Sequence, residues 1–454
     1  MGIYFYPRGG SAHVCRAVAR ELGRNGSEVT VLSGSRSDLD EHTHAPSFYS
    51  GLDLRPVDFA ASLRAADPLR FDGPPGTAPI QGSYEDRHEA EDPVLASLDD
   101  EDFELQVDAW ARELDLAGAA AADLLYLHHL TPLNEAATRA FPEVPVLGHV
   151  HGTELLMLER IAAGAPFGWD HADAWAERLR TWAAACERIV VSDPKGLERA
   201  SEVLEVDRDR FFCVPNGFDR TFAPGAVDRR AHWRRHLVER PRGWRPGSPP
   251  GSVAYEEAEL EALEGTVLLY VGRFTEVKRL PLLVEAYAQA RRHFREPTAL
   301  VLLGGHAAEW EGEHPIETIE RVDCPNVFLA GWHSHADLPD FLRAADLLVH
   351  ASGHEQFGQV LVEAMACGLP AIAVDRGGPA AIVDDPETGW LVPPDDARAF
   401  AAAMVEAVND APGRRARGRR AREVVVDRYA WSQIGLDLGA IADACAERTT
   451  ASGV

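Results

Sequence analysis

Short apolar runs alternate with amphipathic stretches along almost the whole chain. The apolar runs are nearly continuous and rich in Val, Ile and Leu, as expected for strands of a parallel sheet that is buried on both faces. The stretches between them place apolar residues at helical spacing, which is typical of crossover helices. Strands are therefore predicted near residues 2–6, 28–32, 124–127, 146–150, 188–192 and 211–214, and in the second half near 266–271, 299–303, 327–330, 347–350, 370–374 and 389–392.

This alternation predicts an α/β protein with two doubly wound, Rossmann-like domains. The first domain would comprise residues 1–223, with an insertion at about 33–102 that is rich in Pro, Gly, Asp and His. The second would comprise residues 266–428. Residues 224–265 have the Arg, Pro and Gly content of a linker, and residues 429–454 would form a last helix and a tail.

The 454-residue chain has a net charge of −27, from 45 Lys and Arg against 72 Asp and Glu. Such a surface repels a nucleic-acid backbone, so a phosphorylated ligand must be held by a local group of cations and N–H donors. The six cysteines are scattered without a C-x-x-C pair, which fits thiols of a reducing compartment. No signal peptide precedes the first strand, and no apolar run has membrane-spanning length. We therefore expect a cytoplasmic protein with no nucleic-acid partner.

One stretch of the second half carries the most informative motif. Glu355 precedes Phe357 and Gly358, and Glu363 follows about a turn and a half into an apolar helix. Gly358 lets the backbone approach a ligand closely, and the start of the helix offers free N–H groups to an anion. Glu363 can accept hydrogen bonds from sugar hydroxyls, as acidic residues do for ribose in nucleotide-binding folds. The simpler alternative is a capped amphipathic helix with two solvated glutamates.

A cationic turn precedes this motif. Arg273 and Lys278 follow the strand predicted near 266–271, and ligands of parallel sheets collect at the carboxyl ends of strands. Arg offers a planar fork for two phosphate oxygens, and Lys adds a mobile point charge. Arg279 is expected to face outward. An ordinary basic turn is the alternative, but the nearby glutamate motif favours a diphosphate clamp.

A pair of glycines in the first half offers a weaker signal. Gly9 and Gly10 open the first helix directly after the first strand, where backbone N–H groups can face an anion. Because the G-x-G-x-x-G spacing is missing, a nicotinamide dinucleotide site is not supported. The alternative is a tight strand–helix turn.

Histidines mark the end of another first-half strand. Only one of His149 and His151 is expected to face the sheet end, and we favour His151 as a polar contact to a substrate. A metal site is the lesser alternative because no carboxylate follows at metal spacing, so no metal is predicted. The residues that could line the acceptor side are His128, His129, Thr131, Glu154, Trp169, Asp170 and Lys195.

Two arginine-rich segments stand out in this acidic chain. One spans residues 229–245 and contains Trp233 and Trp244, and the other spans residues 414–422. Mixtures of basic and aromatic residues can hold a protein at an anionic membrane face, here the inner face. We prefer the alternative of a solvated linker and an exposed helix.

Taken in order, the motifs resemble those of the retaining glycosyltransferases of family 4, which have the two-domain GT-B fold. The similarity covers almost the whole chain and is carried by Gly9-Gly10-Ser11, His151-Gly152, residues 214–219, Gly272-Arg273 with Lys278, Glu355 with Glu363, and residues 389–393. It implies two Rossmann-like domains facing across a cleft, with the last helix crossing back onto the first domain. It also implies a nucleoside diphosphate sugar donor in the second domain. The acceptor in the first would be a sugar, a small molecule or a lipid-linked molecule.

The resemblance also assigns roles to residues. Arg273 and Lys278 would hold the diphosphate, Glu363 the ribose, and Glu355 the donor sugar, while His151 would lie near the transferred sugar. The catalytic group implied in this way comprises His151, Glu355, Arg273 and Lys278. The donor site implied in this way comprises Gly9, Gly10, Arg273, Lys278, Glu355, Phe357, Gly358, Gln359, Val360 and Glu363.

The function implied by this resemblance is transfer of a hexosyl group from a nucleoside diphosphate sugar to an acceptor hydroxyl with retention of configuration. Neither a cofactor nor a metal is expected, since the nucleotide sugar is a co-substrate. The alternatives are a nucleotide-sugar epimerase or phosphorylase on the same fold, and a non-catalytic homologue that binds nucleotide sugars. The motifs specify neither the base and sugar of the donor nor the acceptor.

Overall fold

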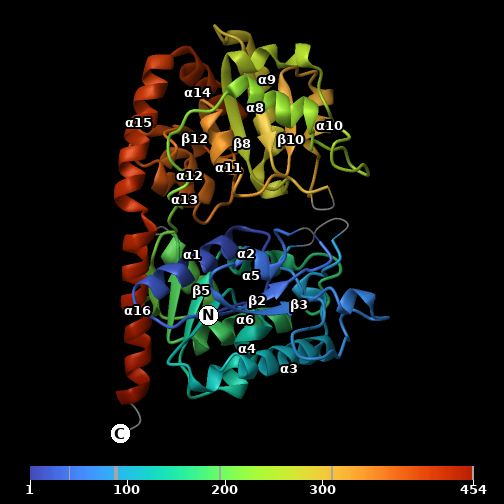
Figure 1. The fold of residues 1–454 in the computed structure, drawn as a ribbon, viewed down its shortest axis with the longest axis vertical. Coiled ribbons are helices and arrows are strands. Elements are labelled where there is room, and N and C mark those ends of the chain that lie inside the picture. Colours follow the sequence, from blue (N-terminus) through green and yellow to red (C-terminus); the bar gives the residue numbers. More distant parts are fainter. Residues whose placement is uncertain (40, 86–89, 194–195, 308–309, 452–454) are drawn as a thin grey trace. The chain divides into compact units, whose positions relative to one another are not determined.

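The chain folds into two compact units, each built around one parallel sheet (Figure 1). The first unit runs mainly from Met1 to Asn216 and is completed by the segment that begins at Trp431, and the second is Gly217–Ala430. The computed structural model describes residues 1–39, 41–85, 90–193, 196–307 and 310–451.

The sheet of the first unit has seven strands in the order β3-β2-β1-β4-β5-β6-β7. All of its strand pairings are parallel. Its strands are β1 (Gly2–Ile3), β2 (Thr30–Ser35), β3 (Asp53–Asp58), β4 (Leu125–His128), β5 (Val146–Val150), β6 (Arg188–Val191) and β7 (Phe211–Cys213). Its helices are α1 (Gly10–Arg24), α2 (Ala45–Phe48), α3 (Asp100–Leu116), α4 (Pro132–Ala140), α5 (Thr153–Gly164), α6 (Ala172–Ala185), α7 (Leu197–Leu204) and α16 (Trp431–Ala451).

The sheet of the second unit has six parallel strands in the order β10-β9-β8-β11-β12-β13. Its strands are β8 (Thr266–Val271), β9 (Thr298–Leu303), β10 (Val327–Gly331), β11 (Leu347–His350), β12 (Ala371–Val374) and β13 (Gly389–Val392). Its helices are α8 (Arg229–Arg234), α9 (Leu280–Ala290), α10 (Pro315–Arg321), α11 (Leu338–Arg343), α12 (Gln359–Ala366), α13 (Gly377–Ile382), α14 (Ala397–Asn409) and α15 (Ala411–Arg428). The prediction of two doubly wound domains is confirmed.

Strand β8 shows why these runs are apolar throughout. Val267 and Leu269 pack into one apolar cluster, whereas Leu268 and Tyr270 pack into another. Successive side chains of a strand point to opposite faces, so the two clusters lie on opposite faces of the sheet. Helices cover both faces, and polar side chains are therefore confined to the strand ends. This confinement places the candidate site residues at the carboxyl edge.

The segment predicted as an insertion, residues 33–102, is an integral part of the first unit. It contains β3, an edge strand that we did not predict, which pairs with β2 along its whole length. Tyr49 and Phe59 from the same segment are fully buried. Pro56 within β3 and charged residues beside it hide the strand pattern in the sequence, since proline is tolerated only at sheet edges.

The prediction that residues 224–265 form a linker is corrected by the structure. Trp233 and Leu237 pack into the core of the second unit, and Trp244 is buried with its indole N–H donating to the carbonyl of Gly305 at 3.2 Å. The Arg and Pro content of the segment suggested a solvated chain, but the buried aromatic and aliphatic side chains fix it to the second sheet. Because these tryptophans are buried, they cannot provide the membrane contact considered as an alternative.

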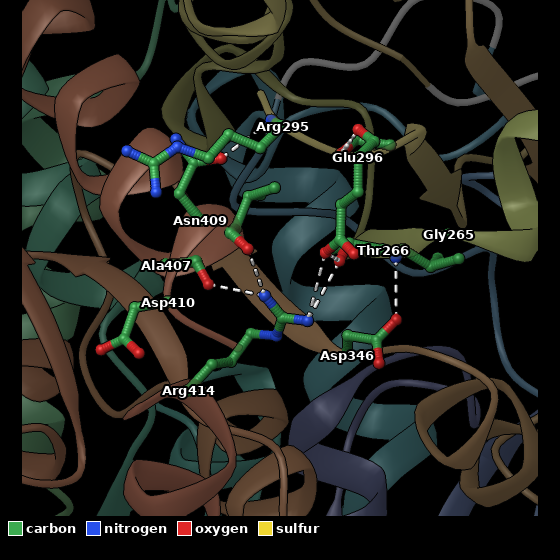
Figure 2. A network of polar contacts seen from close by, with 12 residues as sticks. Gly265, Thr266, Arg295, Glu296, Asp346, Ala407, Asn409, Asp410 and Arg414 are labelled. Atoms are coloured by element: carbon green, nitrogen blue, oxygen red, sulfur yellow. Dashed lines mark hydrogen bonds and ion pairs between the residues drawn. The ribbon is translucent and has the colours of Figure 1, made fainter. Parts of the chain in front are cut away.

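Arginines of the second rich segment also bind within the chain. Arg414 is buried and donates to the carbonyls of Ala407 and Val408 in the last turn of helix α14. It also donates to the Thr266 hydroxyl at 3.0 Å (Figure 2). Glu296 lies 3.7 Å from the same guanidinium. An arginine at the end of a helix satisfies carbonyls that have no partner within the helix. Arg414 is therefore a structural cation that joins α14, α15 and β8, not a membrane contact.

Helix α16 belongs to the first unit, as predicted for the last helix. Ile434 and Leu438 pack with Val14, Val18 and Leu22 of α1. A Cβ added at Gly435 would lie 2.4 Å from the Cβ of Glu21, so the two helices approach closely at this glycine. Within the described part of the chain, no helix combines the length and apolar character needed to span a bilayer.

Candidate functional site

Helix α12 begins at Gln359, directly after the loop that carries Glu355. Its N-cap, Gly358, has a φ of 96°, a left-handed conformation that side chains other than glycine rarely adopt. Phe357 is buried and its ring packs edge-on against Tyr429 at 5.8 Å, so only its backbone borders the start of the helix. The helix start and its glycine therefore have the geometry that the sequence predicted.

Glu355 forms an ion pair with Lys278, which lies 77 positions away in the sequence. His350, the last residue of β11, also lies 3.3 Å from the same carboxylate oxygen. Burial by itself raises the pKa of Glu355, but the Lys278 ammonium and His350 outweigh it and hold the pKa well below its usual range. A fixed, ionised carboxylate and a fixed ammonium thus stand side by side at the carboxyl edge of the second sheet.

The turn after β8 contributes the second predicted cation. Arg273 is exposed, and its carbonyl accepts a hydrogen bond from the Tyr270 hydroxyl at 2.8 Å, which holds the turn against the sheet. Arg279 is exposed and lies 3.0 Å from Asp395, as expected for an outward-facing residue. The turn therefore offers one anchored lysine and one exposed arginine.

Glu363 is buried on α12, 3% exposed, rather than solvated. His335 Nε2 lies 2.7 Å from its Oε1, and the amide of Gln359 donates to the same oxygen at 3.3 Å. Gln359 also donates to the carbonyl of Gly217 at 2.6 Å. The carboxylate is thereby held by two side chains, so its orientation is fixed.

Sequence reasoning missed three residues of this region. His350 ends β11 and His335 follows β10, so both lie at the carboxyl edge of the sheet. This position was the signal that could have found them. Gly378 was missed as well: its N–H donates to the Glu355 carbonyl at 3.1 Å, and a Cβ there would lie 2.2 Å from the Phe357 carbonyl oxygen. The α13 turn therefore supports the loop that carries Glu355.

In the first unit, Gly9 caps α1 in an extended conformation and Gly10 is the first helical residue. A Cβ added at either glycine would meet no described atom within 4 Å. Packing within the described chain therefore does not explain why both positions are glycine. A close approach by a ligand to the helix start remains the prediction.

Four histidines gather where β4 and β5 end. His149 and His151 lie stacked, with ring centroids 4.4 Å apart, because residues two apart in a strand share one face. The two histidines share one face of the sheet, but His149 is buried, whereas His151 is partly exposed. Nδ1 of His128 lies 3.0 Å from Nε2 of His151, and Nδ1 of His129 lies 2.7 Å from a carboxylate oxygen of Glu154.

The other residues considered for the acceptor side have varied positions. His128, His129 and Glu154 are buried, and each of them contacts the partly exposed His151. Thr131 is buried as the N-cap of α4, in a capping box with Asn134. Trp169 is buried and Asp170 is exposed, whereas Lys195 lies outside the described residues. His151 is thus the member of the histidine group that is open to a ligand.

Residues 254–424 match the protein family described as "Glycosyl transferases group 1", a range that contains Arg273, Lys278, Glu355 and Glu363. A D-inositol 3-phosphate glycosyltransferase of Kineococcus radiotolerans is 30% identical over 253 residues, which cover 52% of this chain and 52% of that protein. The lipopolysaccharide core biosynthesis glycosyltransferase LpsE of Rhizobium meliloti is 33% identical over 178 residues, 39% of this chain and 50% of that protein. The chain thus spans about half the length of the curated relatives it matches.

Solved structures show the same fold over the whole chain. HepE of Anabaena, in complex with UDP and glucose, aligns with a TM-score of 0.67 and 16% identity, over 97% of this chain and 98% of that one. The glycosyltransferase WaaG of lipopolysaccharide biosynthesis aligns with a TM-score of 0.61 over the same shares of the two chains. The chain has the GT-B fold. Residues 254–424 of its second unit match the group 1 glycosyltransferases, which agrees with the group of enzymes that the motifs resemble.

Proposed function

We propose that the protein transfers a hexosyl group from a nucleoside diphosphate sugar to an acceptor hydroxyl, with retention of configuration and without a metal. The observation that carries this proposal is the ion pair of Lys278 and Glu355 at the start of α12, within the region shared with group 1 glycosyltransferases. The HepE structures contain UDP and UDP-glucose, which supports a donor of this class.

The second unit would bind the donor. As the bond to the sugar breaks, negative charge develops on the distal phosphate, and Arg273 with Lys278 would stabilise that charge. Because Glu355 anchors Lys278, the ammonium needs little reorganisation when the charge develops. The same two cations supply the positive charge that a divalent metal supplies in other phosphate sites, so the proposal includes none. Glu363, held by His335 and Gln359, would accept hydrogen bonds from the ribose.

Retention would follow from attack on the face from which the leaving diphosphate departs, with a phosphate oxygen taking the acceptor's proton. Glu355 would bind donor hydroxyls rather than attack the sugar carbon, because its carboxylate is already shared between Lys278 and His350. A covalent sugar on Glu355 would disprove this assignment.

The acceptor would bind to the first unit, where His151 is partly exposed above its buried neighbours. Several relatives are named D-inositol 3-phosphate glycosyltransferase and another N-acetyl-alpha-D-glucosaminyl L-malate synthase. These names make small anionic hydroxyl compounds the first acceptors to try.

The donor can be identified by thermal shift with a panel of UDP-, GDP- and ADP-sugars, since a ligand that binds the folded state raises the melting temperature by mass action. The best donor is then incubated with candidate acceptors in EDTA, and the anomeric configuration of the product is read by NMR. A product with inverted configuration, or a strict metal requirement, would contradict the proposal. An epimer formed from the donor alone would indicate the epimerase alternative.

A further inference from the structure

The histidine group of the first unit contains a direct imidazole–imidazole contact. His128 ends β4 and pairs in register with His149 of β5, so His151, two residues further on, shares their face of the sheet. The bonded nitrogens of His128 and His151 lie 3.0 Å apart, whereas the ring centroids are 5.2 Å apart and the planes differ by 17°. The two rings therefore meet edge to edge, with the hydrogen bond lying close to both ring planes.

Both rings are neutral at ordinary pH. Burial lowers the pKa of His128 and of His151 well below the usual value, and the neighbouring histidines lower each pKa further. A neutral imidazole carries one N–H and one lone pair. The contact must therefore have one donor and one acceptor, which leaves two choices of tautomer.

The buried surroundings of His128 select between these choices. Its Nε2 is buried and has no hydrogen-bond partner among the described residues. If Nδ1 of His128 accepted the bond, Nε2 would be a buried N–H without an acceptor, which is rarer in proteins than an unpaired acceptor. If Nδ1 donates, Nε2 carries only an unpaired lone pair. The second arrangement is favoured.

We propose that His128 donates from Nδ1 to Nε2 of His151 and so fixes His151 in the tautomer that carries its proton on Nδ1. His128 is then a positioning residue for transfer, a role that rests on the function proposed above. His151 presents a hydrogen-bond donor to an oxygen of the substrate and cannot accept the proton of the acceptor hydroxyl. The proton must therefore leave by another route, which agrees with a phosphate oxygen as its acceptor.

A metal ion is the competing occupant of this place. His128, His149 and His151 form a group whose ligand nitrogens lie within 4.8 Å of one another. However, the facing nitrogens of His128 and His151 lie only 3.0 Å apart, which leaves no room for an ion between them, since a Zn–N bond is itself about 2.0–2.1 Å long. Nδ1 of His149 is also engaged by the Tyr126 hydroxyl at 2.9 Å. The geometry thus fits a hydrogen-bonded pair better than a coordination site.

The tautomer can be read directly by ¹⁵N NMR of protein labelled at histidine, with the His151 signals assigned from their loss in His151→Gln. We expect a protonated Nδ1 and an unprotonated Nε2 on His151. His128→Asn keeps an N–H near the position of Nδ1 and should preserve this state, whereas His128→Leu should give a mixture of tautomers. In the transfer assay, kcat should fall about 10-fold in His128→Leu and recover in His128→Asn, with little change in KM for the donor.

His232→Leu provides a control, since this histidine is partly buried, in the second unit, and burial likewise lowers its pKa. It should leave the His151 signals unchanged. Should His128→Leu fail to fold, the wild-type and His128→Asn spectra decide alone.

Protonation of His151 at Nε2 in the wild type, or equal populations of both tautomers, would overturn the proposal. So would one-to-one binding of Zn²⁺ to the EDTA-treated protein that shifts the signals of all three histidines. The expected tautomer in a protein without transferase activity would instead leave the histidine pair correct and refute the proposed function.

Discussion

Lys278 is the side chain on which the proposed chemistry depends most. Replacing it with Ala removes the anchored positive charge, and we expect kcat to fall by about 10²-fold or more, as when a charge-stabilising donor is lost. Arg273→Ala should have a similar effect. Arg279→Ala is the matched control, because Arg279 lies in the same turn but is exposed and paired with Asp395. Equal kinetics in the Lys278 and Arg279 variants would refute the diphosphate clamp.

Glu363 should act mainly in binding. Glu363→Gln removes the charged acceptor proposed for the ribose but preserves the shape of a side chain held by His335 and Gln359. We expect the Kd of the donor nucleotide to rise by about 10-fold, near the value of one charge-assisted hydrogen bond, measured by calorimetry. Glu387→Gln, an exposed change after α13, should leave the Kd as it was. A loss of turnover without a change in Kd would assign Glu363 to the chemical step instead.

At the scale of residues, the sequence predicted which side chains belong to the candidate site better than it predicted which of them contact one another. The cationic turn and the glutamate motif named Lys278, Glu355 and Glu363, but not the pairing of Lys278 with Glu355 nor the histidine beside each glutamate. Residues at the carboxyl edge of a parallel sheet come from strands far apart in the chain. Their separation along the sequence therefore says nothing about which side chains meet.

At the scale of elements, substitutions of two glycines at helix starts, Gly10 and Gly358, can distinguish a role in packing from a role in ligand binding. Gly10→Ala adds a Cβ where no described atom lies within 4 Å, so stability should be unchanged or slightly higher, because Ala favours the helix. If a phosphate approaches this helix start, the KM for the donor should nevertheless rise.

Gly358→Ala is the contrasting change. Its φ of 96° and the Leu361 methyl carbon 2.9 Å from the added Cβ predict a loss of about 1–3 kcal/mol in the free energy of unfolding. Urea denaturation and donor kinetics of both variants test the pair. A Gly10→Ala protein that is destabilised but kinetically normal would make that turn purely structural.

The prediction of elements succeeded where one signal dominated. Buried strands such as β9 are apolar from their second residue onward, so burial on both faces was visible in the sequence. Edge strand β3 carries Asp53, Arg55 and Pro56 because one side is open, and its pattern was lost. Residues 224–265 were misread because most of their side chains are polar, which is typical of a linker. A few buried side chains, Trp233 among them, nevertheless contribute enough apolar burial to fix the segment to the second unit.

At the scale of the whole molecule, the buried histidines make stability depend on pH. Burial lowers the pKa of His149 to about 3 and holds those of His128 and His151 well below 6.5. The unfolded chain takes up protons at these positions near pH 6.5, whereas the folded chain does not. Stability should therefore fall as pH decreases from 7 to 5, by up to about 1.4 kcal/mol per pH unit for each histidine.

The lowered carboxylate pKa values act in a different window. Glu355 and Glu154 favour the folded state above their ordinary pKa of 4.5, and this contribution is lost only at more acidic pH. Urea unfolding at pH 7.0 and 5.5 thus measures the contribution of the histidines without that of the carboxylates. The free energy of unfolding of His149→Gln should differ less between the two pH values than that of the wild type. A free energy of unfolding that is the same at both pH values would exclude neutral buried imidazoles.

The packing of α16 on α1 has a consequence for how the chain is made. A ribosome delivers α1 before α16, with the whole second unit in between. Until then the apolar face of Val14, Val18 and Leu22 has no cover from Ile434 and Leu438. In the nascent chain this apolar surface of the first unit therefore stays exposed until α16 has been made. A chaperone that shields the surface during translation should raise the yield of active protein.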